Sequence, residues 1–207
     1  MPLTYFDNER IVEVSWLLSR LGQPRRLLDV GHADAEYAPE LIASGAAVTL
    51  QDVRPFYPRH VPTPLPPNVT LYTWAVPWPV VWTGLFDLVT CISVLDHVGL
   101  DAYGQAEDAE ALPALIAELR RVIAPGGRLL LTVPVGRDLW TTHPGGGQRV
   151  FSARALWDLF DGWTFDSLDL YRYVDGRYVP RDAWRQVADA GYLGDRAEAV
   201  ACLEVRP

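Results

Sequence analysis

The sequence contains no lysine, only two cysteines and no long apolar run. All 18 basic residues are arginines, which we attribute to coding bias before chemistry. The 26 acidic residues outnumber them, so the net charge is -8 and the pI is near 4.9. Nucleic-acid phosphates and anionic membrane surfaces require a basic footprint, so this composition argues against both as partners.

The scarcity of cysteine and of apolar stretches also bears on location. Cys91 and Cys202 lie in strand-like stretches, and we expect two buried free thiols because disulfides are rare in cytosolic proteins. No stretch supplies the ~20 apolar residues of a transmembrane helix. Residues 1–14 carry acids and lack the basic region and apolar core of a signal peptide. We therefore expect a cytoplasmic protein.

The 207 residues, 49% of them apolar and 21% charged, suffice for one domain with a full hydrophobic core. Residues 7–21 predict an N-terminal helix, with Asp7 or Asn8 as its cap. The residues expected on its buried face are Ile11, Val14, Leu17, Leu18 and Leu21.

Strand-like and helix-like stretches alternate along the rest of the chain. Strands are predicted over 25–31, 46–53, 68–74, 85–95, 128–136, 164–174 and 198–206. Helices are predicted over 36–45, 108–123, 152–160 and 180–191. This alternation is typical of a parallel sheet with helices on both faces, so we predict a single α/β domain with a mostly parallel seven-stranded sheet.

Residues 53–85 differ in composition from their surroundings. Eight of the 17 prolines lie between Pro55 and Pro79, together with Trp74, Trp78 and Trp82. Proline fixes its own backbone and donates no hydrogen bond, so a stiff, extended, aromatic-rich loop is expected around the third strand.

Three features fall where strands of the predicted sheet end. Gly31 follows the first strand, Asp52 ends the second, and residues 93–97 follow the fourth. In an open parallel sheet, ligands bind beyond the carboxyl ends of the strands. Gly31 permits a tight turn and close approach of a ligand, and an acid about 20 residues later can accept hydrogen bonds from both ribose hydroxyls. This pair fits any adenosine-bearing cofactor.

The loop after Gly31 is poor in glycine. A dinucleotide loop needs further glycines at positions 33 and 36, where this chain has Ala33 and Glu36. A carboxylate at the start of the following helix would repel a diphosphate, so a cofactor without phosphate fits better. A nicotinamide-dependent enzyme is therefore the disfavoured alternative. A second alternative, that this stretch is a plain strand-to-helix turn that binds no ligand, also stays open.

Four stretches, in order, resemble the class I S-adenosylmethionine-dependent methyltransferases. They are "LLDVGHADA" (27–35), "VTLQDVRP" (48–55), "FDLVTCISVLDHVGL" (86–100) and "LRRVIAPGGRLLLTVPVG" (119–136). The resemblance implies a Rossmann-like methyltransferase fold and S-adenosyl-L-methionine as cofactor. The single domain, 1–207, would then comprise the N-terminal helix (7–21), a cofactor-binding core (25–137) and an acceptor-side segment with the closing strands (138–207).

Two further stretches narrow the resemblance. "SVLDHVGLDAYG" and "LTVPVGRD" are similar to a bacterial branch that accompanies sugar, glycan and natural-product biosynthesis. Members of that branch commonly have an alanine and an aspartate after the first-motif glycine, as in residues 31–34 here. The resemblance implies a small-molecule or sugar acceptor and a monomer or homodimer.

The resemblance also implies a cofactor site. Its residues would be Asp29, Gly31, His32, Ala33, Asp52, Val53, Trp74, Ala75, Ile92 and Ser93. The family often has an acid after the third strand that reads the adenine amino group, whereas this chain has Trp74 or Ala75 there. Adenine is therefore expected to stack on Trp74, with backbone groups reading its edge.

Catalysis on a hydroxyl acceptor needs a base. His97 is the candidate, because it follows the fourth strand on the ligand edge and imidazole titrates near neutral pH. Asp96, where the family more often has glutamate, would orient that imidazole or face the cofactor. Tyr103 and Arg137 are candidates for the acceptor pocket, and a His97 that only orders its loop is the alternative.

No metal site is expected, because His32, Asp34 and Glu36 lack an identifiable fourth partner. The sequence thus predicts an S-adenosylmethionine-dependent methyltransferase that methylates an oxygen of a small molecule or sugar. A methyltransferase-like binding module with little or no turnover is the first alternative, and the nicotinamide-dependent enzyme is the second.

Overall fold

The structure, a computed structural model, describes residues 8–32, 35–54, 61–143, 146–194 and 196–207. Its α-helices are α1 (Arg10–Arg20), α2 (Ala38–Ala43), α3 (Ala111–Val122) and α4 (Ala153–Leu159). Single 3-10 turns occur at η2 (Val80–Trp82) and η3 (Trp184–Gln186). None of the helices in these ranges is long and apolar enough to span a membrane.

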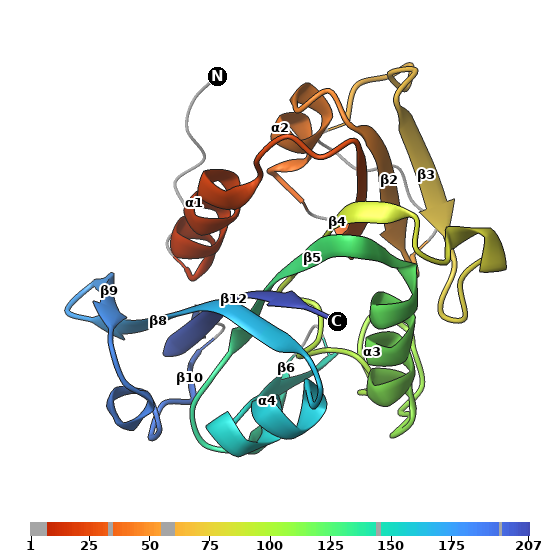
Figure 1. Ribbon diagram of the computed structural model, residues 1–207. Coiled ribbons are helices and arrows are strands. Elements are labelled where there is room, and N and C mark those ends of the chain that lie inside the picture. The colour runs from red at the N-terminus through yellow and green to blue at the C-terminus, as the bar shows by residue number, and fades with distance from the viewer. Residues whose placement is uncertain (1–7, 33–34, 55–60, 144–145, 195) are drawn as a thin grey trace.

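One sheet of eight strands organises the molecule (Figure 1). In spatial order its strands are β3 (Val69–Thr73), β2 (Ala47–Asp52), β1 (Arg26–Val30), β4 (Phe86–Ile92), β5 (Ile123–Pro134), β12 (Ala199–Arg206), β8 (Thr164–Val174) and β9 (Arg177–Arg181). Neighbours from β3 to β5 pair in parallel. Those from β5 to β9 pair antiparallel.

The sheet is covered by helices on both faces, as predicted. Helices α1 and α2 cover one face, where Trp16, Leu17 and Leu41 join a buried cluster. Helices α3 and α4 cover the other face with a second cluster. Adjacent residues such as Leu27 and Leu28 belong to opposite clusters because side chains alternate across a strand. The result is the predicted Rossmann-like α/β architecture.

The predicted seven strands become eight because of β9. A helix was expected over 180–191, but β9 ends at Arg181 and only the turn η3 follows. Asp175 and Gly176 both adopt positive φ, of 49° and 85°, between β8 and β9. An Asp-Gly pair of this kind favours a tight hairpin, and it turns the chain back before a helix can start.

The N-terminal helix is shorter than expected and buries the predicted face only in part, because Leu17 is fully buried and Val14 and Leu21 pack against the same cluster. Ile11 is 49% exposed, whereas Glu13 is fully buried. Asn8 does cap the helix start, because its side-chain oxygen accepts a hydrogen bond from the backbone N–H of Arg10 at 3.1 Å. Asp7 lies outside the described residues. The hydrogen bonds that Glu13 forms with the sheet therefore bury a position that the apolar pattern did not predict to be buried.

Two small hairpins lie outside the main sheet. Strands β6 (Leu139–His143) and β7 (Gly146–Val150) pair antiparallel, as do β10 (Tyr192–Leu193) and β11 (Arg196–Ala197). The backbone of β7 is hydrogen-bonded to the loop after β4, through Arg149 N to Asp96 O and Gly147 N to Asp101 O, both at 2.9 Å. This brace holds the loop that carries His97.

Candidate cofactor site

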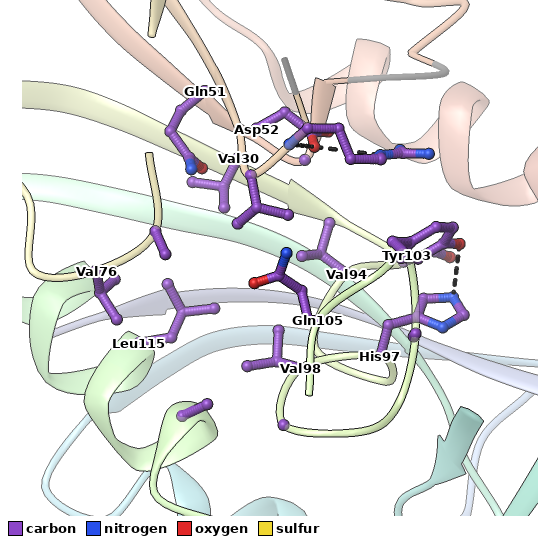
Figure 2. Close-up of a pocket in the computed structure, with 18 of the residues that line it drawn as sticks. Val30, Gln51, Asp52, Val76, Val94, His97, Val98, Tyr103, Gln105 and Leu115 are labelled. Atoms are coloured by element: carbon purple, nitrogen blue, oxygen red, sulfur yellow. Dashed lines mark hydrogen bonds and ion pairs between the residues drawn. The ribbon is translucent and has the colours of Figure 1, made fainter. Parts of the chain in front are cut away.

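A cavity of about 400 Å³ opens at the carboxyl ends of the parallel strands (Figure 2). Its lining includes Val30 at the end of β1, Gly31 directly after it, Asp52 at the end of β2 and Ser93 after β4. The loop between β4 and α3 and the segment after β3 complete the walls. The sheet edge chosen from the sequence is thus where the cavity lies.

Asp52 faces this cavity from the end of β2. The residue is only 3% exposed. Its Oδ1 accepts hydrogen bonds from the backbone N–H of Arg54 at 2.8 Å and from the Arg54 Nε at 3.3 Å. The Arg54 guanidinium in turn lies over the Tyr103 ring, 4.4 Å from its centroid. A preorganised, charge-neutralised carboxylate therefore stands at the mouth of the cavity.

Gly31 is required by the packing around it. Its φ is +80°, and a Cβ at this position would lie 2.4 Å from the Val94 Cγ2. Any larger residue would have to displace the side chain of Val94. The close approach predicted for Gly31 therefore serves contact between the loops after β1 and β4, and both residues line the cavity.

Asp29 does not line the cavity. It is fully buried in β1, where its Oδ1 accepts hydrogen bonds from Thr90 Oγ1 at 2.5 Å and Tyr37 Oη at 3.3 Å. Its Oδ2 has no hydrogen-bond partner among the residues that the structure describes. Burial raises the pKa of Asp29 from its ordinary 3.8 to about 7. This carboxyl is therefore sealed beneath the cavity.

Two more of the residues chosen from the sequence lie off the cavity, and a third is not described. His32 is buried in the loop after β1, and burial lowers its pKa. Trp74 is 63% exposed and does not line the cavity, so the expectation that adenine stacks on its ring is not supported by its position. Ala33 lies outside the described residues.

The remaining residues chosen for the cofactor all line the cavity, namely Gly31, Asp52, Val53, Ala75, Ile92 and Ser93. Ser93 adopts a positive φ of 49°, which is strained for a residue with a Cβ. Its hydroxyl donates to Glu13 Oε1 at 2.6 Å. The serine side chain is therefore held by the protein.

His97 lines the cavity, and Asp96 is buried behind it. The His97 Nδ1 is 2.9 Å from the carbonyl oxygen of Gly147, and a carbonyl only accepts, so Nδ1 carries a hydrogen. The Nε2 lies 3.3 Å from Asp96 Oδ2 and 3.3 Å from Tyr103 Oη. Burial raises the pKa of Asp96, and the neighbouring His97 partly opposes that shift.

This arrangement gives His97 one exchangeable position. With Nδ1 committed to a carbonyl, protons enter and leave the ring at Nε2. That nitrogen is flanked by a carboxyl that can balance an imidazolium charge and by a phenol that can donate to a neutral ring. The side chain can therefore act as a base at the cavity wall. Arg137, by contrast, does not line the cavity.

Arg10 is a lining residue that the sequence reasoning missed. Its Nη1 donates to Glu13 Oε2 at 3.2 Å and to the carbonyl oxygen of Ile92 at 3.3 Å. Glu13 is anchored in turn, because its Oε1 accepts from Ser93 Oγ and Thr132 Oγ1, at 2.6 and 2.7 Å. A buried network thus fixes a guanidinium at the cavity from helix α1. The only sequence signal was a basic residue one helical turn from an acid.

The other side of the cavity is apolar and includes Ala75, Val76, Trp78, Val98 and Leu115. Figure 2 shows Val76 and Leu115 across the cavity from His97 and Tyr103, with the side chain of Gln105 between them. Ala75 and Tyr103 were predicted from the sequence as site residues, whereas Gln105 was not. Hereafter the polar lining means Arg10, Asp52, Arg54 and His97. The apolar lining means Ala75, Val76, Trp78, Val98 and Leu115.

The described residues contain no group of three or more His, Cys, Asp or Glu side chains that could hold a metal ion. Cys91 and Cys202 are buried free thiols in β4 and β12, as predicted. Neither lines the cavity.

No family model and no curated protein matches the chain. Solved structures do resemble it. The 1,6-didemethyltoxoflavin-N1-methyltransferase of Burkholderia thailandensis, with bound S-adenosylhomocysteine, is 16% identical over 94% of this chain and 76% of its own, with a TM-score of 0.62. An S-adenosylmethionine-dependent methyltransferase from Methanosarcina mazei is 14% identical over 92% and 96%, with a TM-score of 0.62.

A third solved structure has a different activity. The 4+2 cyclase SpnF is 22% identical over 75% of this chain and 59% of its own, with a TM-score of 0.54. At such identities the likeness establishes the fold, and a shared fold does not fix the reaction. The chain therefore has the Rossmann-like fold found in S-adenosylmethionine-dependent methyltransferases.

Proposed function

We propose that this protein is an S-adenosylmethionine-dependent methyltransferase that methylates an oxygen of a small molecule or sugar. One observation carries the proposal. The cavity at the ends of β1, β2 and β4 is lined by the carboxylate of Asp52, the guanidinium of Arg10 and the imidazole of His97. Structural neighbours that are methyltransferases, one with bound S-adenosylhomocysteine, support this assignment.

The lining fits the chemical parts of this cofactor. Asp52 would accept hydrogen bonds from ribose hydroxyls, as an acid at the end of the second strand does in nucleotide-binding folds. Arg10 would hold the carboxylate of the methionine tail by a charge-assisted hydrogen bond. The apolar lining would take the purine. The cofactor carries no phosphate, and the guanidinium of Arg54 is already engaged with Asp52.

When bound, the cofactor supplies a methyl group activated on a sulfonium. The protein must then hold the acceptor against that group and take up the proton that the acceptor loses. Positioning alone can contribute roughly 7 to 11 kcal/mol to such a displacement. His97 would receive the proton at Nε2, and the Asp96 carboxylate, 3.3 Å away, would stabilise the imidazolium.

The base favours oxygen as the acceptor atom. A hydroxyl is a weak nucleophile until its proton is removed, whereas a neutral amine already has a free lone pair. A histidine at the cavity wall whose Nε2 can exchange a proton, backed by a buried carboxyl, is suited to the first case. A binding module would need no such base, so the arrangement of His97 favours an enzyme over a binding module.

Calorimetry tests the proposal without knowledge of the acceptor. S-adenosylmethionine and S-adenosylhomocysteine should bind, and NAD should not. A panel of hydroxylated metabolites and sugars, followed by mass spectrometry for a gain of one methyl group, then tests turnover. Binding of NAD alone would refute the proposal. Cofactor binding with no transfer to any acceptor would favour the binding module.

A further inference from the structure

The segment after β3 offers no side-chain acceptor for an adenine amino group. Trp74 occupies the position of the expected acid, and its exposed ring lies off the cavity. The lining residues of this segment are Ala75, Val76 and Trp78. Two of these have aliphatic side chains, and the indole of the third only donates. The 6-amino group of a purine in the apolar lining would therefore lack a side-chain acceptor from this segment.

Gln105 brings a polar group into the cavity from another element. It lies on the loop between β4 and α3, and its carboxamide projects between Val30 and Val98 (Figure 2). Its backbone N–H donates to the carbonyl oxygen of Ala102 at 2.9 Å, which fixes the turn. The carboxamide itself forms no hydrogen bond with the described residues. A donor and an acceptor are thus both presented to the cavity.

Resting on the proposed function, we propose that Gln105 reads the adenine base of the cofactor. A carboxamide is complementary to adenine, because its oxygen accepts from the 6-amino group while its nitrogen donates to an adjacent ring nitrogen. Val76, Val98 and Leu115 supply apolar contacts for the purine faces. Recognition of the base has therefore moved from the end of β3 to the loop after β4.

The neighbouring polar groups are less suited to this task. Asp108 and Glu110 also line the cavity, but an ionised carboxylate only accepts hydrogen bonds. The Oδ1 of Asp108 is already used by the backbone N–H of Glu110 at 2.9 Å. Gln51 has its Nε2 committed to the carbonyl oxygen of Trp74 at 2.6 Å. Of these side chains, Gln105 alone has both hydrogen-bonding functions uncommitted.

A double-mutant cycle between protein and ligand tests the assignment. Calorimetry would compare S-adenosylhomocysteine with its analogue in which hydrogen replaces the 6-amino group. Wild-type protein should bind the analogue about tenfold more weakly, as expected for one lost hydrogen bond. Gln105→Ala should bind S-adenosylhomocysteine about tenfold more weakly than wild type and should discriminate between the two ligands less than about threefold.

Two matched variants sharpen the cycle. Gln105→Glu keeps an acceptor for the 6-amino group, so it should retain most of the discrimination. Glu107→Ala lies on the same loop, is exposed and does not line the cavity, so it should behave as wild type. Thermal unfolding of each variant checks that the exposed substitutions leave the fold intact.

The outcomes separate this inference from the function it rests on. Failure of wild-type protein to bind S-adenosylhomocysteine would remove both. Normal binding by wild type, together with unchanged or tighter binding by Gln105→Ala, would show that Gln105 only fills the empty cavity and would overturn the inference alone. Persistence of full discrimination in Gln105→Ala would overturn the inference, and its loss in Asp108→Ala would reassign the contact to Asp108.

Discussion

The polar and apolar linings of the cavity are built in different ways. Each residue of the polar lining is already engaged in the protein, as Arg10 is with Glu13 and Asp52 is with Arg54. The apolar lining offers shape and no side-chain acceptor, and the nearby carboxamide of Gln105 is uncommitted. The polar lining is therefore preorganised, whereas selectivity for the base is left to one loop residue.

This difference has an energetic consequence. Side chains held by their neighbours lose little freedom when a ligand arrives, so their contacts contribute more of their strength to affinity. An exposed glutamine must be ordered, at a cost of up to about 2 kcal/mol. Substitutions in the polar lining should therefore have larger effects on binding and turnover than those in the apolar lining.

The largest expected effect lies just beneath the polar lining, at Asp29. With its pKa raised to about 7, the folded protein holds a proton between about pH 4 and 7 that the unfolded chain releases. Stability from this group is full below about pH 4 and is lost as the pH rises through 7. Asp29→Asn should remove this dependence, on the order of 4 kcal/mol.

Urea unfolding at several pH values between 4 and 8 measures the effect of Asp29. Burial also raises the pKa of Glu9 to about 7, so Glu9 changes the free energy of unfolding with pH in the same direction. The variant is therefore compared with wild type at each pH. Parallel stability curves would show that Asp29 is ionised in the folded protein. Cofactor affinity should be little changed, since Asp29 does not line the cavity.

Within the polar lining, His97 should matter most for turnover. Removal of a general base typically costs a factor of about 100 or more in rate. His97→Ala should therefore lower kcat by at least that much while changing the dissociation constant of S-adenosylhomocysteine less than about threefold. Rates with an acceptor from the metabolite panel and calorimetry give the two numbers. The reverse pattern would reassign His97 to cofactor binding.

Asp52 should dominate cofactor affinity. A hydrogen bond to a charged group is worth roughly 1.5 to 3 kcal/mol, so Asp52→Ala should weaken S-adenosylhomocysteine binding by about tenfold or more. The substitution also removes the carboxylate that Arg54 contacts, so thermal unfolding serves as the control for altered loop structure. An unchanged dissociation constant would remove Asp52 from the site.

Arg10 should act on one part of the ligand only. Arg10→Gln keeps a donor for Glu13 but removes the charge, so binding of S-adenosylhomocysteine should weaken about fivefold. Methylthioadenosine lacks the amino-acid tail, and its affinity should not change. Equal losses for both ligands would mean that Arg10 acts through the shape of the site.

The apolar lining should give the smallest effect. Val98→Ala removes two methyl groups from the apolar lining, where ligand contacts do not depend on hydrogen bonds. A lost apolar contact of this size should weaken binding roughly two- to fivefold. The loss should be the same for S-adenosylhomocysteine and its 6-deamino analogue. A selective loss for one of them would contradict the division of roles between Val98 and Gln105.

The sequence predicts most of the fold because its signals are local. Apolar stretches and their bounding residues locate β1 to β4, and Ser152 caps α4 as a serine at a helix start should, accepting from Ala155 N at 3.2 Å. The Asp175–Gly176 turn is a local signal that the prediction did not use, so β9 was not predicted and its last two residues, Pro180 and Arg181, were placed in a helix. The buried face of α1 could not be predicted from local signals, because Glu13 is buried by contacts with the distant residues Ser93 and Thr132.

The residues of the candidate site also differ in whether local sequence signals predict them. Strand order places Gly31, Asp52 and the residues after β4 at one edge, so these could be found from spacing alone. Arg10 reaches the cavity from a helix far away in the sequence, and no pattern in its neighbours shows this. Trp74 is 63% exposed and does not line the cavity, and its place in the resemblance to a family motif does not show this.

A crystal structure of the complex with S-adenosylhomocysteine tests the central claim most directly. The adenosine should occupy the cavity at the ends of β1, β2 and β4, with both ribose hydroxyls within hydrogen-bond distance of the Asp52 carboxylate. Density for the ligand elsewhere, or adenosine in the cavity with both ribose hydroxyls beyond hydrogen-bond distance of Asp52, would contradict the account.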